Sequence, residues 1–170
     1  DETPLTATSM VYAGASLDGT TLSLAFYAVG GPQSTLHLRT VDLATPAVGT
    51  TAQIAPSSTS TFLTPNHRGE ALSDNGRWLI FTATSQIATP QGPEIGTDVY
   101  VYDRLAKVTE LVSTTAYFPT YAISISGDGS RILFASADSN LVANDTNTSC
   151  QMGITTNCTD LFVVANPLLN

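Results

Sequence analysis

The stretch "SISGDGSRILFAS" at residues 124–136 decides the fold, because the chain carries related stretches at two earlier places. These are "SLDGTTLSLAF" at 16–26 and "SDNGRWLIF" at 73–81. Each contains Ser-x-(Asp/Asn)-Gly followed by an apolar run, and the turn glycines are Gly19, Gly76 and Gly129. A motif that returns about every 55 residues indicates a repeat architecture.

Asp-Gly and Asn-Gly pairs favour two-residue hairpin turns, because both residue types tolerate a positive φ. We therefore expect strands on both sides of each turn, followed by a third strand and, in two units, a fourth. The expected strands are 10–16, 22–26, 36–42 and 50–55, then 69–73, 78–81, 98–103 and 109–113, then 121–126, 132–135 and 160–165.

The chain is therefore predicted to be all-β, with three consecutive four-stranded antiparallel units in one domain. The units span about 9–55, 67–113 and 119–170. The third unit lacks its outer strand unless the N-terminal "ETPLTAT" or a partner chain supplies it.

Three apolar runs indicate how the units pack. "WLIF" (78–81), "VYVY" (99–102) and "LFVV" (161–164) do not alternate between apolar and polar residues. Both faces of these strands should therefore be covered. A single meander cannot cover both of its own faces, so we expect the units to stack face to face as blades.

The pattern resembles the TolB-type, WD-like bacterial β-propeller repeat. Its blade reads Ser-x-Asp-Gly, an apolar strand ending near Phe, Asp-(Ile/Val)-Tyr-Val-x-Asp, and a strand ending in Leu-(Thr/Ser). "SDNGRWLIF…TDVYVYDRLAKVTELVS" follows this along a whole blade, and "SGDGSRILFASADSNLVANDTN…TDLFVVA" follows it through three strands. The first unit departs from it, with His37 where Asp98 and Asp160 stand and with Arg39 inside the apolar strand. The resemblance implies a β-propeller-like fold but not a particular function.

Three blades are too few for a closed ring, because propellers typically close with about four to eight blades. Three solutions remain open. The chain is a piece of a longer propeller, or copies join through uncovered strand edges into a six-bladed ring or an open assembly. In the third solution the sheets pack in a compact prism-like or sandwich arrangement.

The charge of the chain excludes two classes of partner. The net charge is −8, with 14 acidic and six basic residues, and the basic residues do not cluster. Nucleic acid and anionic membrane surfaces are therefore not expected partners. No apolar run is long enough for insertion into a membrane.

The two cysteines favour an oxidising compartment. Cys150 and Cys158 lie in one polar loop, where a local disulfide is the leading interpretation and two free thiols are the alternative. The same loop holds three candidate glycosylation sites, Asn144, Asn147 and Asn157, and the favoured alternative is a polar loop in which Asn, Ser and Thr are simply frequent. The beginning "DETPLTATS" fits a mature or excised product, so we expect a secreted, periplasmic or cell-surface protein.

Sequence motifs for chemistry are weak. Asp145, Asn147 and Ser149 are spaced as in a calcium loop, but Cys150 stands where such a loop has Gly and its final Glu is missing, so an Asx-turn is the favoured interpretation. Asp98 and Asp160 are interpreted as strand-starting turn residues, and no Gly-x-Ser-x-Gly motif is present. We therefore predict no catalytic residues and no cofactor other than this weak calcium candidate.

Long connections should emerge on one side of the units, at 27–34, 56–68, 82–97, 114–120 and 136–159. Long loops on a rigid scaffold usually carry binding. The exposed candidates there are Phe62, His67, Arg68, Tyr117 and Phe118, and the alternative is that Phe62 and Phe118 fill gaps between blades.

These features favour a non-catalytic, extracytoplasmic β-propeller-like scaffold or binding module for protein or glycan, which includes a role as one subunit of a larger assembly. The alternative is a non-catalytic propeller segment of a larger hydrolase of the peptidase type. A lectin-like module is a third interpretation.

Overall fold

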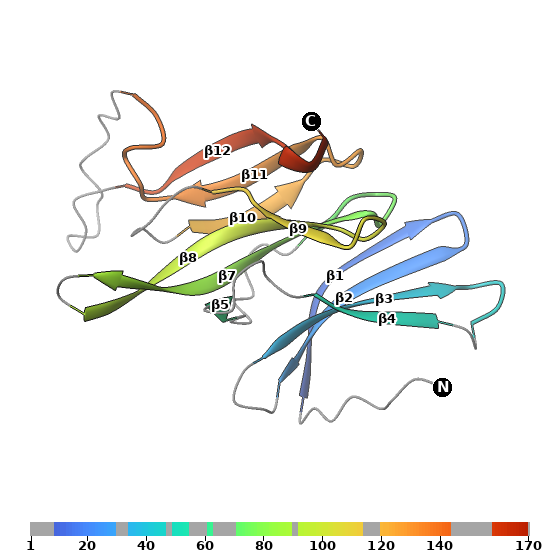
Figure 1. Ribbon diagram of the computed structural model, residues 1–170. Helices are drawn as coiled ribbons and strands as arrows, with labels where there is room; N and C mark the ends of the chain where they lie inside the picture. Colours follow the sequence, from blue (N-terminus) through green and yellow to red (C-terminus); the bar gives the residue numbers. More distant parts are fainter. Residues whose placement is uncertain are drawn as a thin grey trace.

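The chain is all-β in its computed structural model, which describes residues 9–29, 34–46, 49–54, 61–62, 71–89, 92–113, 120–143 and 158–169. Three antiparallel sheets stack in chain order (Figure 1). Within the described residues, every regular element is a strand except η1, one turn of 3-10 helix at Pro167–Leu169.

The first sheet is a four-stranded meander in the order β1-β2-β3-β4. Its strands are β1 (Ser9–Asp18), β2 (Thr21–Val29), β3 (Thr35–Asp42) and β4 (Gly49–Ile54). All four expected strands of the first unit are therefore confirmed.

The second sheet is built around two long strands, β7 (Trp78–Thr89) and β8 (Gly92–Asp103), with β9 (Val108–Leu111) on the far side of β8. Two short strands, β5 (Thr61–Phe62) and β6 (Ala71–Leu72), both pair with β7 on the side away from β8. Five strands thus fill four positions. Since β5 precedes residue 67, the sheet begins earlier in the chain than the expected second unit.

The third sheet has the three expected strands, β10 (Thr120–Ile125), β11 (Arg131–Ser136) and β12 (Asp160–Ala165). Among the described residues β12 pairs with β11 alone, so its other edge has no neighbour. The "ETPLTAT" stretch lies outside the described residues, and its completion of this sheet stays a prediction.

Strand register shows that the three units are equivalent. In each sheet, the residue seven positions after the turn glycine pairs with a residue of the next strand. These pairs are Phe26 with His37, Ala83 with Asp98, and Ser136 with Asp160, and His37, Asp98 and Asp160 are the three positions that the repeat aligns. Positions in one sheet can therefore be compared directly with positions in another.

The turn glycines have positive φ as predicted, at 56° for Gly19, 61° for Gly76 and 77° for Gly129. Only the first turn is a two-residue hairpin, formed by Gly19 and Thr20. The prediction of two-residue turns at Gly76 and Gly129 is wrong. There the strands separate two residues earlier, because the serine that begins each motif takes part in the turn.

In the second turn, the amide of Gly76 donates to the Ser73 carbonyl, and the Ser73 hydroxyl donates to Asn75 Oδ1 at 2.8 Å. The Ser73 hydroxyl also accepts a 3.0 Å hydrogen bond from the amide of Trp78. In the third turn Ser126 and Asp128 make the same bonds. In the second and third units, the serine and the Asp or Asn of the motif therefore close the turn, whereas in the first unit Ser16 and Asp18 lie in β1.

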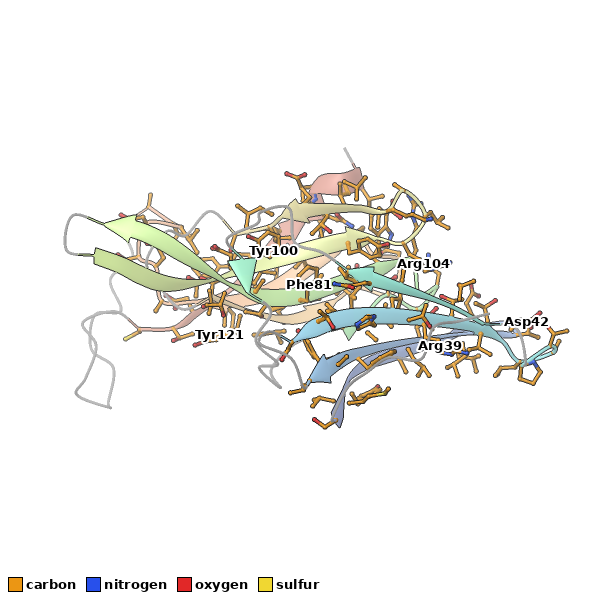
Figure 2. All side chains as sticks on the ribbon, turned by 60° about the horizontal axis from the view of Figure 1, so that its bottom comes forward. Arg39, Asp42, Phe81, Tyr100, Arg104 and Tyr121 are labelled. Atoms are coloured by element: carbon orange, nitrogen blue, oxygen red, sulfur yellow. The ribbon has the colours of Figure 1, made fainter. Side chains whose placement is uncertain are left out.

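The middle sheet is covered on one face by the first sheet. One core cluster joins them and contains Ala25, Tyr27, Leu36, Leu38 and Ile54 from the first sheet and Leu79, Phe81, Ala83, Tyr100 and Tyr102 from the second. Figure 2 labels Phe81 and Tyr100 in this layer, where their rings stack with centroids 5.6 Å apart.

The other face of the middle sheet is covered by the third sheet. A second cluster contains Trp78, Ile80, Val99 and Val101 from the second sheet and Ala122, Ile125, Ile132 and Phe134 from the third. Neighbouring residues of "WLIF" and "VYVY" thus enter different clusters, and the prediction that both faces of these strands are covered is confirmed. We call the face of a sheet that points to the next sheet along the chain its front face, and the opposite face its back face.

The same prediction is wrong for "LFVV" in β12. Phe162 and Val164 pack against the second cluster, but Leu161 and Val163 are 68% and 65% exposed. They lie on the front face of the third sheet, which no other sheet covers in the described residues.

The connection expected at 82–97 is mostly strand. β7 continues to Thr89 and β8 begins at Gly92, so the two strands project beyond the rest of the sheet as a hairpin (Figure 1). Asp98 consequently lies within β8 and does not start a strand, whereas Asp160 does begin β12.

The described sheets stack without closing into a ring, so a propeller remains a prediction. Adjacent sheets are also tied at their turns. The Ser16 hydroxyl donates to the Asp74 carbonyl at 2.5 Å, and the Asp74 amide donates to the Gly127 carbonyl at 2.9 Å.

Two glycine substitutions separate backbone strain from crowding. A Cβ at Gly129 would lie on the indole ring of Trp78, whereas a Cβ at Gly19 would meet nothing within 4 Å. Both positions have positive φ, so we expect Gly19→Ala to lower the free energy of unfolding by about 1 kcal/mol and Gly129→Ala by about 3 kcal/mol. Urea denaturation measures both, and equal losses would contradict the packing of the third turn on Trp78.

Candidate interaction surface

Most of the site residues expected from sequence lie outside the described residues, and their predictions stay untested. These are the surface candidates His67, Arg68, Tyr117 and Phe118, the calcium candidates Asp145, Asn147 and Ser149, the asparagines Asn144 and Asn157, and Cys150.

Two candidates fall within the described residues. Phe62 was expected in a connection but lies in β5, where it pairs with Thr84 of β7. Cys158 lies two residues before β12 and is not a free thiol. Its pairing with Cys150 stays a prediction, since Cys150 is outside the described residues.

Hydroxyl groups form a buried polar seam where the hairpin of the second sheet leaves the stack. The Thr120 amide donates to Thr97 Oγ1 at 2.9 Å, and the hydroxyls of Thr120 and Ser136 lie 2.9 Å apart. Nearby, the Ser113 hydroxyl donates to Asp98 at 3.2 Å and accepts from the Val99 amide at 3.0 Å. The seam uses its polar groups to join the second and third sheets.

Asp138 follows the seam in the connection after β11. Its carboxylate accepts 2.9 Å hydrogen bonds from both the amide and the side-chain nitrogen of Asn140, and its own amide donates to the Ser136 hydroxyl. This arrangement is an Asx-turn, which orders the start of the connection.

The carboxyl groups that close the turns have lowered pKa values, which suit a structural role. In Asp103, burial opposes ionisation, but hydrogen bonds from Arg77, Leu105 and Ala106 outweigh it and lower the pKa. In Asp128, hydrogen bonds from Ser126 and Ser130 lower the pKa to about 2. A general acid at neutral pH needs the opposite shift, because it must stay protonated until it reacts.

His37 is also enclosed. Its ring stacks on Phe26 with centroids 5.4 Å apart, and its Nε2 lies 2.8 Å from the Thr35 hydroxyl. The side chain is 4% exposed, and burial lowers its pKa. The imidazole therefore stays neutral and out of reach of a substrate in solution.

No group of three or more His, Cys, Asp or Glu that could hold a metal ion occurs among the residues the structure describes. In the same part of the chain, no helix is long and apolar enough to cross a membrane.

The most prominent exposed feature is the front face of the third sheet. Leu161 and Val163 on β12 are joined there by Leu133 of β11, which pairs with Val163, and by Ile123 of β10, which is 39% exposed. Sequence reasoning missed this surface because it treated every apolar run as covered. The signal that could have found it is that the third repeat is the last of the three in this sequence, so no described sheet lies on its front face.

The back face of the first sheet is the second exposed apolar surface. On β1, Met10, Tyr12 and Leu17 are 61%, 70% and 59% exposed. Tyr12 pairs with Phe26 and Leu17 with Leu22, so their side chains share one face with those of β2. Sequence reasoning did not single out these residues either.

No protein-family model, curated protein or solved structure matches the chain.

The pH dependence of stability tests the contribution of the Asp128 carboxylate to the third turn. Because the pKa of Asp128 is lower in the folded than in the unfolded chain, its contribution to stability is complete above about pH 4 and is lost as the pH falls toward about 2. Asp128→Asn, which copies Asn75 of the second turn, removes this titration, so the stability difference between wild type and variant should shrink on acidification. Urea denaturation across this range measures it, and a carboxyl titration midpoint near that of a free aspartate in carbon-detected NMR would contradict it.

Proposed function

We propose that this chain is a non-catalytic, extracytoplasmic β-propeller-like module that binds protein through its uncovered sheet faces and acts as one part of a larger assembly. The observation that carries the proposal is the exposure of Leu161 and Val163 on the front face of the third sheet.

Equivalent positions in the other sheets support this role. By strand register, Leu161 and Val163 correspond to Val99 and Val101 of the second sheet, both 0% exposed beneath the third sheet. Leu38 of the first sheet also corresponds to Leu161 and is buried under the second sheet. A surface whose counterparts are buried elsewhere in the chain is suited to burial by a partner.

The chemistry of this face favours protein over glycan. Its exposed side chains on β12 are aliphatic, whereas sugar recognition requires hydrogen-bonding groups directed at hydroxyls. Apolar patches rimmed by polar residues are typical of protein interaction sites. The downward pKa shifts of Asp103 and Asp128 and the burial of His37 support a role without catalysis.

The TolB-type resemblance supports the propeller-like arrangement, and the three stacked, register-equivalent sheets are compatible with it. Extracytoplasmic location is supported by the expected Cys150–Cys158 disulfide, because such bonds persist in oxidising compartments.

Site-specific cross-linking tests the binding role. A photo-reactive amino acid placed at Leu161 should cross-link to protein in the cells that make the chain. The matched control is Leu105, which is 63% exposed in the turn between β8 and β9, away from the face. We expect several-fold more cross-linking from Leu161. Equal or absent cross-linking at the two positions would contradict the proposal.

A thiol measurement tests the compartment. The purified chain should be lighter than its reduced form by two hydrogen atoms, and Cys158→Ser should lower the free energy of unfolding by about 2 kcal/mol, because the disulfide restricts the unfolded chain. Alkylation of both cysteines in the native, unreduced protein would contradict this prediction.

A further inference from the structure

We propose that the front face of the third sheet docks on the back face of the first sheet of a second copy, so that two chains form a closed, head-to-tail ring of six sheets. The inference rests on the proposed binding role and names the partner as this same chain.

The first argument is the direction of stacking. The front of the first sheet packs on the back of the second, and the front of the second packs on the back of the third. The same front-to-back interface is thus formed twice within one chain. One front face, on the third sheet, and one back face, on the first, remain without a partner among the described sheets.

The second argument is the chemistry of the two uncovered faces, compared with the buried front and back faces of the other sheets. The buried back faces hold stacked cross-strand rings, Phe81 with Tyr100 and Phe134 with Phe162. The back face of the first sheet also holds a stacked pair, Phe26 with His37, although His37 itself is buried. This pair lies two residues away from the equivalent positions, which are occupied by Leu24 and Arg39.

On the third strand of each compared sheet, the front face carries aliphatic side chains at the positions that meet these rings. Val99 and Val101 hold these positions on the second sheet, packed in one cluster with Phe134. Leu161 and Val163 occupy the corresponding positions on the third sheet. A second copy therefore offers these two residues the same type of surface that the middle sheet already meets inside the chain.

The third argument is closure. A front-to-back contact is heterologous, and such contacts generate either rings or open filaments. Two copies supply six sheets, which lies within the range of about four to eight at which propellers close. In this ring both copies use both faces, so no apolar sheet face of the described residues remains exposed.

Sedimentation measurements on the whole chain test the ring. The wild type should sediment at twice its 17.8 kDa mass at micromolar concentration. Two double variants disable one face each: Leu161→Lys with Val163→Lys on the front, and Tyr12→Asp with Leu17→Asp on the back. Each alone should sediment as a single chain, with circular dichroism unchanged because all four positions are exposed.

Mixing the two variants is the decisive step. The intact back face of the first variant can meet the intact front face of the second, and the remaining interface brings lysine opposite aspartate. An equimolar mixture should therefore recover the doubled mass. Leu105→Lys, the exposed control away from both faces, should leave the wild-type mass unchanged.

Three results would overturn the inference. A single-chain mass for the wild type would do so, and so would doubled mass in the back-face variant, since that indicates pairing of two front faces. Doubled mass in the front-face variant would indicate pairing through the free edge of β12, which uses backbone groups. If Lys impairs folding, Leu161→Thr with Val163→Thr keeps strand propensity and should still weaken association.

The same experiments separate this inference from the proposed function. A single-chain wild type whose Leu161 position cross-links another protein would reject the ring and leave the binding role intact. A single-chain wild type with no selective cross-linking at Leu161 would reject both.

Discussion

The structure depends on the burial of both faces of its middle sheet. Alternate residues of β7 point in opposite directions, so that Phe81 packs toward the first sheet and Ile80 toward the third, and each is 0% exposed. Removing either neighbouring sheet would expose one complete apolar face. Because apolar burial contributes about 25 cal/mol per Å², the middle sheet is stable only as the centre of a stack. Since β7 and β8 belong to this centre, the outer sheets are positioned by it.

Much of this stack could be predicted from the sequence, because the turn motif fixes the phase of each strand. Once Gly76 is placed, the apolar run after it must present neighbouring residues to opposite faces. The hairpin at 82–97 was missed because its glycines and prolines are typical of a loop, while its stability depends on strand pairing that composition does not report. The exposure of Val163 was missed for another reason. An apolar run shows that a sheet face is suited to burial. Whether another sheet covers that face depends on how the sheets are arranged, which the run itself does not specify.

Threonine and serine have a role that composition alone did not reveal. Threonine favours strands, yet several hydroxyls of both residue types here connect one sheet to the next. Thr82 Oγ1 accepts a 3.0 Å hydrogen bond from the Ala122 amide across the interface between the second and third sheets. Such a bond satisfies a buried backbone donor that would otherwise cost about 1–3 kcal/mol. It also fixes the relative position of two sheets whose apolar contacts are not directional. Placing these bonds requires the stack itself, which is why the polar seam between the second and third sheets could not be located from sequence.

The polarity of the stack explains why its two ends differ. Each sheet has a front and a back that carry different side chains, because the repeat unit is asymmetric. In the second sheet, for example, Val99 and Val101 lie on the front and Phe81 and Tyr100 on the back. If the two faces of a sheet were identical, two front faces could pack on each other. Because the faces differ, a front face packs on a back face. Any stack of such units therefore leaves one face of each type, whatever the number of sheets, until a ring closes. The exposed Leu161 and the exposed Tyr12 lie on the two faces that such a stack leaves uncovered. The physical rule that builds the core between the described sheets is the same rule that would build a contact between chains.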